Sequence, residues 1–300
     1  MNFFGKIKNR IEHTINSTWL IVKIFPNKKK YIYSQRVLLP REHNLTDILN
    51  IYPQYSQNLK RVFNEVIKKY KLITVIDVGA NIGDSVILFN SVKHVPILAV
   101  EGDKKYFRYL IKNTAKVSDI RAINTYLGNI IEKTTVRSTS KHGTLNLITG
   151  KKSLETKIDT LDHLLTAHNN FRHSKLYKID TDGFDTKIIK GSLNYIKNAK
   201  PIIFFEFVPD LLFANDENPP DIFRIFGRLG YKKMLIYDNL GDFIISLDFI
   251  DRDKIEDIVN YFTGWGEKKY CDIVVFHKDD VDIFNKLRRN EIRTKIKKSF

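Results

Sequence analysis

Carboxylates and glycines follow a buried apolar run near residue 77, in a pattern that suits the binding of a nucleoside. Residues 74–86 read Thr-Val-Ile-Asp-Val-Gly-Ala-Asn-Ile-Gly-Asp-Ser-Val, so a β-branched run leads into an Asp-x-Gly-x-Asn-x-Gly turn. Glycine lets the backbone turn tightly and approach a ligand without a clash from Cβ. We expect Asp77 to accept hydrogen bonds from that ligand. The turn that would hold it consists of Gly79, Ala80, Asn81 and Gly83.

A second acidic residue follows at the distance expected of a ribose-binding carboxylate. Residues 72–77 read as a first strand, residues 84–93 as a helix and residues 96–101 as a second strand. Glu101 therefore ends a strand about 20 residues beyond the glycine turn, where a carboxylate can chelate the two hydroxyls of a ribose. An ordinary α/β turn would explain the glycines but not two correctly spaced carboxylates. The pattern predicts a βαβ nucleoside pocket.

The spacing of the glycines indicates which nucleoside cofactor to expect. The turn reads Gly79-x-Asn81-x-Gly83 and lacks the Gly-x-Gly-x-x-Gly pattern, in which a third glycine serves helix packing and pyrophosphate approach. A cofactor without pyrophosphate fits better, and S-adenosylmethionine is the leading candidate. Two alternatives stay open: an NAD-type enzyme on the same ribose-binding unit, and a noncatalytic, membrane-associated scaffold that retains the fold.

A second carboxylate-rich segment lies at residues 176–191, where Leu-Tyr-Lys-Ile-Asp-Thr-Asp-Gly-Phe-Asp is followed by Ile-Ile-Lys-Gly. Asp180 ends a strand, and ligands in open α/β sheets bind outside the carboxyl ends of strands. Asp180 is therefore expected to point into the pocket. Asp182 and Asp185 follow in the turn and in the first turn of a helix, where acidic residues also cap helices. For Asp185 we favour capping; for Asp182 both roles stay open.

The pattern along the chain predicts three parts: an N-terminal basic amphipathic and extended segment (1–55), an α/β domain (56–280) and a basic C-terminal tail (281–300). Helical stretches alternate with most of the expected strands, which favours a mostly parallel sheet with helices on both faces. The strands are expected near residues 72–77, 96–101, 120–127, 176–180, 201–207, 232–237 and 272–277.

Composition is typical of a globular enzyme. The 300 residues are 43% hydrophobic and 12% aromatic, which is ample for the core of one large α/β domain. The single cysteine, Cys271, lies in an apolar run, so an intramolecular disulfide is excluded and the thiol reads as a core side chain. We expect a cytoplasmic protein.

The formal net charge of +16 is concentrated at the two ends of the chain. Apolar residues recur at three- and four-residue spacing from Phe3 to Val22 with basic residues off that stripe, which predicts a basic amphipathic helix within residues 3–25. Such a helix would bind the inner face of a membrane peripherally, or pack on the catalytic domain or a second subunit, which we weight slightly higher. No nucleic-acid-binding module accompanies the charge, so no specific nucleic acid partner is expected.

An ordered set of motifs resembles the FkbM-type methyltransferases. The set begins with Val-Ile-Asp-Val-Gly-Ala-Asn-Ile-Gly at 75–83 and Ala-Val-Glu at 99–101. It continues with Ile-Asp-Thr-Leu-Asp at 158–162, Lys-Ile-Asp-Thr-Asp-Gly at 178–183, Ile-Lys-Gly at 189–191 and Pro-Ile-Ile-Phe-Phe-Glu at 201–206. The family more usually reads Lys-Ile-Asp-Val-Glu-Gly where this chain has Thr181 and Asp182, so the carboxylate at position 182 has a shorter reach.

The resemblance implies a Rossmann-like class I methyltransferase fold with a seven-stranded sheet, and O-methylation of a hydroxyl on a sugar, glycan or glycosylated metabolite. It implies that Asp77, Gly79, Asn81, Gly83 and Glu101 hold S-adenosylmethionine, with Asp180 near its methionine end. Methyl transfer depends mainly on orienting the acceptor hydroxyl for in-line attack, and a base helps because such a hydroxyl is a poor nucleophile. Asp180 and Glu206 are the candidates for binding or deprotonating it, although Glu206 could equally position a loop.

A metal site is a further hypothesis from the same strand ends. Asp180, Asp182 and Glu206 carry the oxygen ligands that Mg²⁺ prefers, and the sequence leaves open whether the site takes a metal. The histidines at 163, 168 and 173 are spaced by five, so they do not match a helical zinc pair.

Overall fold

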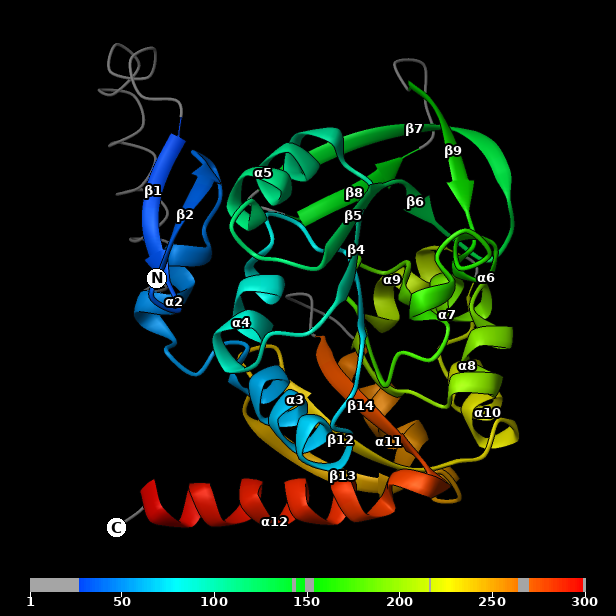
Figure 1. Ribbon diagram of the computed structural model, residues 1–300. Helices are drawn as coiled ribbons and strands as arrows, with labels where there is room; N and C mark the ends of the chain where they lie inside the picture. The colour runs from blue at the N-terminus through cyan, green and yellow to red at the C-terminus, as the bar shows by residue number, and fades with distance from the viewer. Residues whose placement is uncertain (1–26, 142–143, 149–153, 216, 264–269, 299–300) are drawn as a thin grey trace, which may run out of the picture.

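The computed structural model describes residues 27–141, 144–148, 154–215, 217–263 and 270–298. The amphipathic helix expected within residues 3–25 lies outside these residues. A central sheet of eight strands forms the middle of the molecule, in the order β13-β12-β14-β11-β10-β3-β4-β5 (Figure 1). Its strands are β3 (Val75–Val78), β4 (Ile97–Glu101), β5 (Ile120–Asn124), β10 (Leu176–Ile179), β11 (Ile202–Phe207), β12 (Tyr231–Asp238), β13 (Phe243–Asp248) and β14 (Cys271–His277).

The sheet contains a parallel half and an antiparallel half. Strands β5, β4, β3, β10 and β11 pair in parallel, whereas β14 runs antiparallel to both β11 and β12, and β13 runs antiparallel to β12. Each of the seven expected regions contributes a strand of this sheet, and β13 adds an eighth at its edge. In chain order the seven have the arrangement 3-2-1-4-5-7-6, which confirms the Rossmann-like class I methyltransferase fold. The order reverses between β3 and β10, where open sheets bind ligands.

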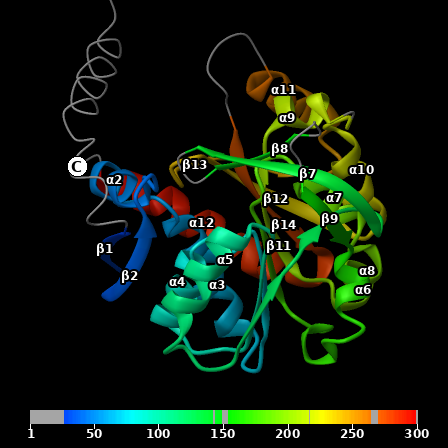
Figure 2. The same ribbon diagram turned by 90° about the horizontal axis from the view of Figure 1, so that it is seen from above.

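Helices cover both faces of this sheet (Figure 2). Successive side chains of a strand point to opposite faces, and apolar side chains are buried on both, so each face needs a covering layer. One face carries α3 (Gln57–Lys69), α4 (Asp84–Val92), α5 (Lys104–Thr114) and α12 (Val281–Lys298). The other carries α6 (Leu161–Leu164), α7 (Asp185–Lys190), α8 (Leu193–Ala199), α9 (Pro209–Ala214), α10 (Asp221–Arg228) and α11 (Arg252–Phe262). Two short 3₁₀ turns cover Asn169–Phe171 and Lys278–Asp280.

A smaller sheet, β6-β9-β7-β8, was not expected from the sequence. The single strand expected over residues 120–127 divides into β5 and β6 (Tyr126–Leu127), because the chain leaves the central sheet at Thr125. Strands β7 (Glu132–Lys141), β8 (Thr144–Ile148) and β9 (Leu154–Asp159) follow as antiparallel neighbours. This sheet covers the carboxyl-end side of β4 and β5 in Figure 1.

The N-terminal segment is docked beside the glycine turn. Strands β1 (Asn27–Ile32) and β2 (Gln35–Pro40) form a hairpin, and α2 (Leu45–Ile51) follows it. The buried side chain of Asn113 on α5 accepts from Leu38 N at 2.8 Å and donates to Leu38 O at 2.9 Å and to Ile82 O at 2.8 Å. One amide thus links the hairpin, α5 and the turn that begins α4.

The basic C-terminal segment forms the helix α12, which runs along one edge of the molecule beneath α3 and β13 (Figure 1). Buried Glu291 anchors it, since Oε1 accepts from Arg61 Nε on α3 at 2.6 Å and from Tyr237 Oη on β12 at 3.1 Å. Arg61 also donates to Gly241 O in the β12–β13 turn at 3.1 Å. The helix therefore supports the antiparallel half of the sheet.

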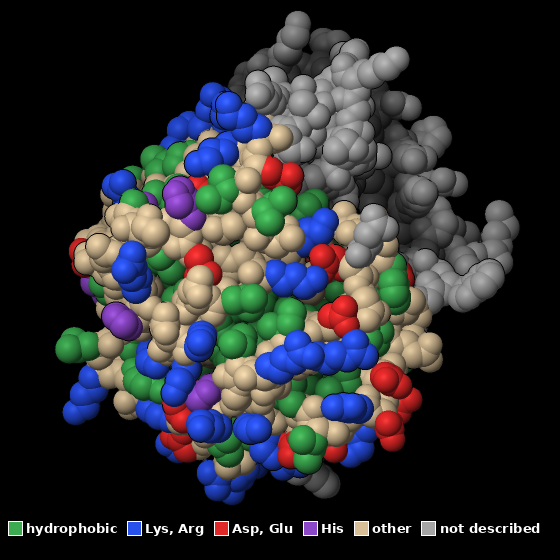
Figure 3. Space-filling view, turned by 90° about the vertical axis from the view of Figure 1, so that its right-hand side faces the viewer, with side chains coloured by type: hydrophobic (Ala, Val, Ile, Leu, Met, Phe, Trp, Pro, Cys, Tyr) green, Lys and Arg blue, Asp and Glu red, His purple; other side chains and the backbone are tan. Residues whose placement is uncertain are grey.

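Charged side chains are dispersed on the surface. Figure 3 shows Lys and Arg side chains spread over the face formed by α6, α7, α8 and α10, mixed with acidic and apolar ones. Within the described residues, no helix has both the length and the apolar composition needed to cross a bilayer.

We predict that Asn113→Ala destabilises the protein by roughly 2 to 4 kcal/mol, because it leaves three buried backbone groups without partners. The free energy of unfolding in urea is the measurement. Asn170→Ala, at an exposed position in a 3₁₀ turn, is the matched control and should change stability by less than about 0.5 kcal/mol. Equal losses in the two variants would contradict the docking role of Asn113.

Candidate functional site

Lys178 lies at the centre of the carboxyl ends of the parallel strands. Its side chain is 6% exposed, and Nζ lies 3.2 Å from Asp77 Oδ1 on β3 and 3.4 Å from Asp180 Oδ2 just beyond β10. The same Nζ donates to Gly79 O at 3.1 Å. Lys178 and Asp77 are register partners on adjacent strands, which places the ion pair at the point where the strand order reverses.

Burial and the neighbouring carboxylates act in opposite directions on Lys178. Burial alone would lower the pKa of the ammonium, but Asp77, Asp180 and Asp84 together raise that pKa above its usual range. Asp84 at the start of α4 has a pKa raised to about 6, chiefly because it is desolvated. Lys178 is therefore positively charged at neutral pH, and Asp84 keeps its proton to a higher pH than an exposed aspartate does.

The glycine turn is held by β4 from one side and by β10 from the other. Gly79 N and Ala80 N both donate to Val100 O, at 2.9 and 3.1 Å. Gly79 has φ +76°, and a Cβ there would lie 1.8 Å from Asp180 O. No other residue fits at this position unless the loop after β10, which contains Asp180, moves away. Gly83 has φ +90° at the N-cap of α4, and its α carbon faces α5. The turn thus brings the ends of β3 and β10 into direct contact.

Glu101 at the end of β4 is oriented by two backbone donors. Oε2 accepts from Asn81 N at 2.8 Å, and Oε1 accepts from Asp103 N at 2.7 Å. Burial raises the pKa of this carboxyl to about 7, against the two hydrogen bonds, which lower it. Since each carboxylate oxygen has a second lone pair, both remain able to accept a bond from a ligand.

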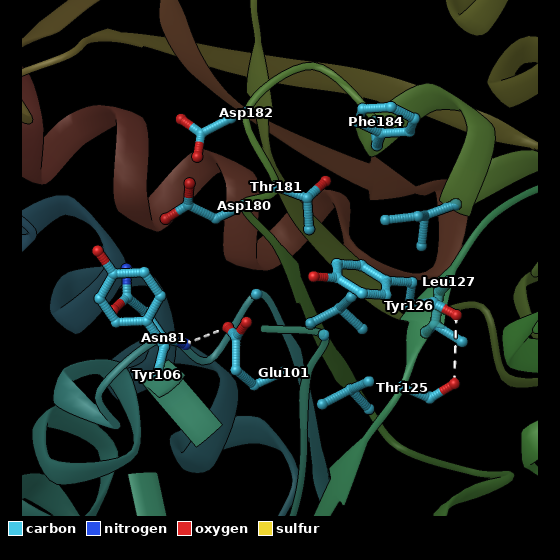
Figure 4. A pocket seen from close by; sticks show the side chains of 15 residues that line it. Asn81, Glu101, Tyr106, Thr125, Tyr126, Leu127, Asp180, Thr181, Asp182 and Phe184 are labelled. Atoms are coloured by element: carbon cyan, nitrogen blue, oxygen red, sulfur yellow. Dashed lines mark hydrogen bonds between the residues drawn. The ribbon is translucent and has the colours of Figure 1, made fainter. Parts of the chain in front are cut away.

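Glu101 faces a cavity of about 580 Å³ that we call the glycine-turn cavity. Figure 4 shows Glu101 between Asn81 and Tyr106 on one side and Tyr126 and Leu127 on the other, with Asp180 across the cavity. Further lining comes from Phe184, Ile188 and Val100, which are apolar. Gly102 permits this arrangement, because a Cβ there would lie 2.2 Å from the Tyr126 ring.

Two more cavities continue from this one toward α3. The outer carboxylate cavity, about 790 Å³, shares Gly79, Asn81, Asp180 and Asp182 with the glycine-turn cavity and is covered by α2 and its flanking residues. The inner carboxylate cavity, about 610 Å³, lies deeper against α3 and α4. The outer and inner cavities share Tyr55, Asp84, Lys178, Asp180, Glu206 and Tyr270.

Carboxyl groups crowd the walls of these two cavities. Burial, followed by the nearby Asp180, Asp182, Asp185 and Asp272, raises the pKa of Glu206 well above its usual range. Burial also raises the pKa of Asp272, in the wall of the inner carboxylate cavity, to about 7. It raises the pKa of Asp185, at the start of α7, to about 7. Close negative charges favour a bound proton, so these carboxyls keep their protons to a higher pH than exposed carboxyls do.

The described residues contain no group of three or more His, Cys, Asp or Glu side chains arranged to hold a metal ion. Asp180 and Asp182 lie close to each other in the loop between β10 and α7, and Figure 4 shows both at the rim of the glycine-turn cavity. Glu206 lines the outer carboxylate cavity together with both of them, and the inner carboxylate cavity together with Asp180. The three carboxylates considered for Mg²⁺ from the sequence therefore line one cavity, but among the described residues they do not form a close group of metal ligands, and Mg²⁺ binding stays a prediction.

The structure places the sequence-predicted residues in two layers. Gly79, Asn81, Glu101 and Asp180 line the glycine-turn cavity. Asp77, Ala80 and Gly83 lie beneath it: Asp77 is fully buried and accepts from Ser85 Oγ, and Ala80 is fully buried in the core. The expected direct contact of those three with a cofactor stays a prediction. In the structure they shape the turn from below.

Sequence reasoning missed residues from outside the glycine motifs. Lys178 stands two residues before Asp180 on one strand, and this period-two spacing, which puts both on one face, could have revealed it. His43, Tyr55, Tyr126 and Tyr270 come from segments far apart in the chain, and no local signal marks them. His43 Nδ1 accepts from Leu45 N at 3.3 Å, so its Nε2 can donate to Asn81 Oδ1 at 3.3 Å.

We predict that Lys178→Met destabilises the protein by about 3 to 5 kcal/mol, because Asp77 would be left buried without its cation. Asp77→Asn in the same chain should restore part of this loss, and urea unfolding of both single variants and the double variant measures the coupling. Lys197→Met, at an exposed position on α8, serves as the control. Strictly additive losses would show that the two residues do not act as a pair.

Several solved structures have a similar backbone arrangement. A methyltransferase FkbM from Methylobacillus flagellatus KT is 15% identical, with 68% of this chain and 43% of that chain covered and a TM-score of 0.40. M. jannaschii TYW2 in complex with AdoMet is 11% identical, with 84% and 85% covered and a TM-score of 0.42. A human methyltransferase 10 domain containing protein is 12% identical, with 92% and 98% covered and a TM-score of 0.38. This chain thus spans less than half the length of the first of these structures.

No curated protein matches the sequence. The model of the methyltransferase FkbM domain matches residues 77–233, which is more than half of the chain. The matched region begins at Asp77 and includes the glycine turn, Glu101, Lys178, Asp180 and Glu206. The chain therefore belongs to the FkbM methyltransferase family.

Proposed function

We propose that this protein is an S-adenosylmethionine-dependent O-methyltransferase that acts on a hydroxyl of a sugar, glycan or glycosylated metabolite. The observation that carries the cofactor assignment is Glu101, a buried carboxylate at the end of β4 whose two oxygens are oriented by Asn81 N and Asp103 N. The acceptor class rests on the family and on the polar character of the adjoining cavities.

The residues around the glycine-turn cavity suit each part of this cofactor. Glu101 would accept hydrogen bonds from both ribose hydroxyls, and the apolar wall of Leu127, Phe184 and Ile188 would enclose the adenine. Asp180, whose side chain is 48% exposed, would face the methionine end. Gly79 lets the glycine turn pack against the loop after β10, because a Cβ there would lie 1.8 Å from Asp180 O. The turn lacks the third glycine that serves pyrophosphate approach, which supports S-adenosylmethionine over NAD.

The cofactor supplies an electrophilic methyl group, and the protein must orient a hydroxyl and receive its proton. When the hydroxyl oxygen bonds to the methyl carbon, the carbon–sulfur bond breaks and the hydroxyl proton is released. Asp180 and Glu206 both face the outer carboxylate cavity and are the candidate acceptors of that proton. Burial and the neighbouring carboxylates raise the pKa of Glu206, which favours its taking up a proton, and Asp180 forms an ion pair with Lys178.

The location and the other partners are part of the same proposal. We propose a cytoplasmic enzyme that acts on a lipid-linked glycan at the inner face of a membrane. Its basic N-terminal segment would bind the anionic membrane surface, and each Lys or Arg near that surface adds about 1 kcal/mol to the free energy of binding. No specific nucleic acid is proposed as a partner.

We predict that binding of S-adenosylhomocysteine weakens roughly tenfold between about pH 8 and about pH 6. The ribose hydroxyls need the ionised form of Glu101, whose pKa is about 7, so affinity should rise with pH through this range and level off above it. Isothermal titration at each pH measures the change.

The control is Glu101→Gln, which has no charge to lose and should give weaker binding, by one to two orders of magnitude at high pH, with a flatter pH profile. Other carboxyls titrate in the same range, so only the difference between the two proteins reports on Glu101. Unchanged affinity in the variant would remove Glu101 from the cofactor site.

We predict that incubation with methyl-labelled S-adenosylmethionine and a panel of nucleotide sugars, lipid-linked sugars and polysaccharides places the label on carbohydrate oxygen. Mass spectrometry of the product locates the methyl group. Glu206→Gln should lower kcat with little effect on cofactor affinity, since this side chain lines the acceptor side. Label confined to protein, nucleic acid or amine nitrogen would reject the O-methylation of sugars.

A further inference from the structure

Three carboxylates stand in one row across three adjacent strands. Ile179 pairs with Phe205 between β10 and β11, so the next residues, Asp180 and Glu206, are neighbours. Glu206 pairs in turn with Asp272 on β14. Strands in a sheet lie about 4.8 Å apart, and residues of one row point to the same face. Like charges placed directly opposite each other destabilise a sheet, so this row needs a compensating partner.

The described residues supply few hydrogen-bond donors to this row. Asp272 Oδ2 accepts from Asn58 Nδ2 at 2.8 Å, and Asp180 shares Lys178 with Asp77. Glu206 Oε2 is buried and has no hydrogen-bond partner in the part of the chain that the structure describes. Lys178 is the single Lys or Arg among the described residues that line the two carboxylate cavities. An unpaired buried acceptor costs free energy that a donor from a ligand would recover.

The row faces a partly open cavity whose lining includes aromatic side chains. Glu206 and Asp272 line the inner carboxylate cavity together with Tyr55 near the start of α3 and Tyr270 at the start of β14. The cavity is continuous with the outer carboxylate cavity through Glu206, and thereby with the glycine-turn cavity. Tyr55, Tyr270 and Asp272 lie outside residues 77–233, so these walls are built by parts of the chain that the family model does not match.

We propose that the inner carboxylate cavity binds a protonated amino group of the acceptor, so that the acceptor is an amino sugar or a related compound with an amine close to the hydroxyl that is methylated. This inference rests on the proposed function. A protonated amine donates up to three hydrogen bonds and carries the charge that the row lacks. A phosphate or carboxylate on the same part of the acceptor would be repelled. The tyrosine rings offer surfaces for the apolar side of a sugar.

The test compares three matched glycosides on the full chain saturated with S-adenosylhomocysteine: methyl α-glucosaminide, methyl α-glucoside and the N-acetylated glucosaminide. Ligand-observed NMR titration at one pH near neutrality gives each dissociation constant. The glucosaminide should bind about tenfold or more tightly than the other two, because only it carries the charge. Equal binding of the three glycosides, or no binding by any, would overturn the proposal.

Variants separate this site from the amino group of the cofactor itself. Asp272→Asn and Glu206→Gln should each reduce the preference for the amine severalfold and leave S-adenosylhomocysteine affinity unchanged; Asp257→Asn, at an exposed position on α11, should change neither. If one of these two variants does not fold, the amine preference of the other variant tests the proposal. Loss of cofactor affinity in place of amine preference would assign the row to the cofactor. Failure of the unaltered protein to bind the cofactor would instead refute the proposed function.

Discussion

The contact between Lys178 and Asp77 organises both halves of the site. Two buried opposite charges in register on β3 and β10 are stable only if both are present, because either one alone would carry a large desolvation cost. Their position is the switch point of the sheet, where the loops after the two strands separate and leave room for a ligand. Lys178 extends this link to the loops themselves through Gly79 O and Asp180. Lys178 thus links the loops that form the cavity floor to the sheet beneath them.

A surplus of carboxyl groups surrounds that one cation. Asp84, Asp185, Glu206 and Asp272 have raised pKa values, chiefly because the protein has removed them from water. A fold selected for stability alone would not retain such a group of acids, since replacing buried charges by apolar residues often stabilises a protein. The cost is understandable where function requires it, in binding a positively charged or hydroxylated ligand and in receiving a proton.

Segments on both sides of the region that the family model matches contribute to the walls of the cavities. The hairpin of β1 and β2 carries His43, Tyr55 and α2 toward the cavities, and Asn113 ties that hairpin to the glycine turn. At the other end, Glu291 on α12 holds Arg61, whose contact with Gly241 O orders the turn beside Asn58. Asn58 in turn donates to Asp272. Variable segments placed on a constant sheet are a common way in which one fold serves different substrates.

Local sequence was sufficient for the seven strands, the glycine turn and Glu101, because each depends on a short pattern: an apolar run, glycines with positive φ, and a carboxylate at a strand end. It also indicated Asp180 and Glu206. The layer beneath the cavity was not accessible in this way, since the burial of Asp77 depends on Lys178, which is about 100 residues away. The row of Asp180, Glu206 and Asp272 likewise arises from pairing between distant segments. The eighth strand, β13, and the strands β7 and β8 of the small sheet instead form local hairpins, whose alternating patterns were not used to predict strands. Strand register and helix docking, which depend on long-range packing, were decided by the tertiary structure alone.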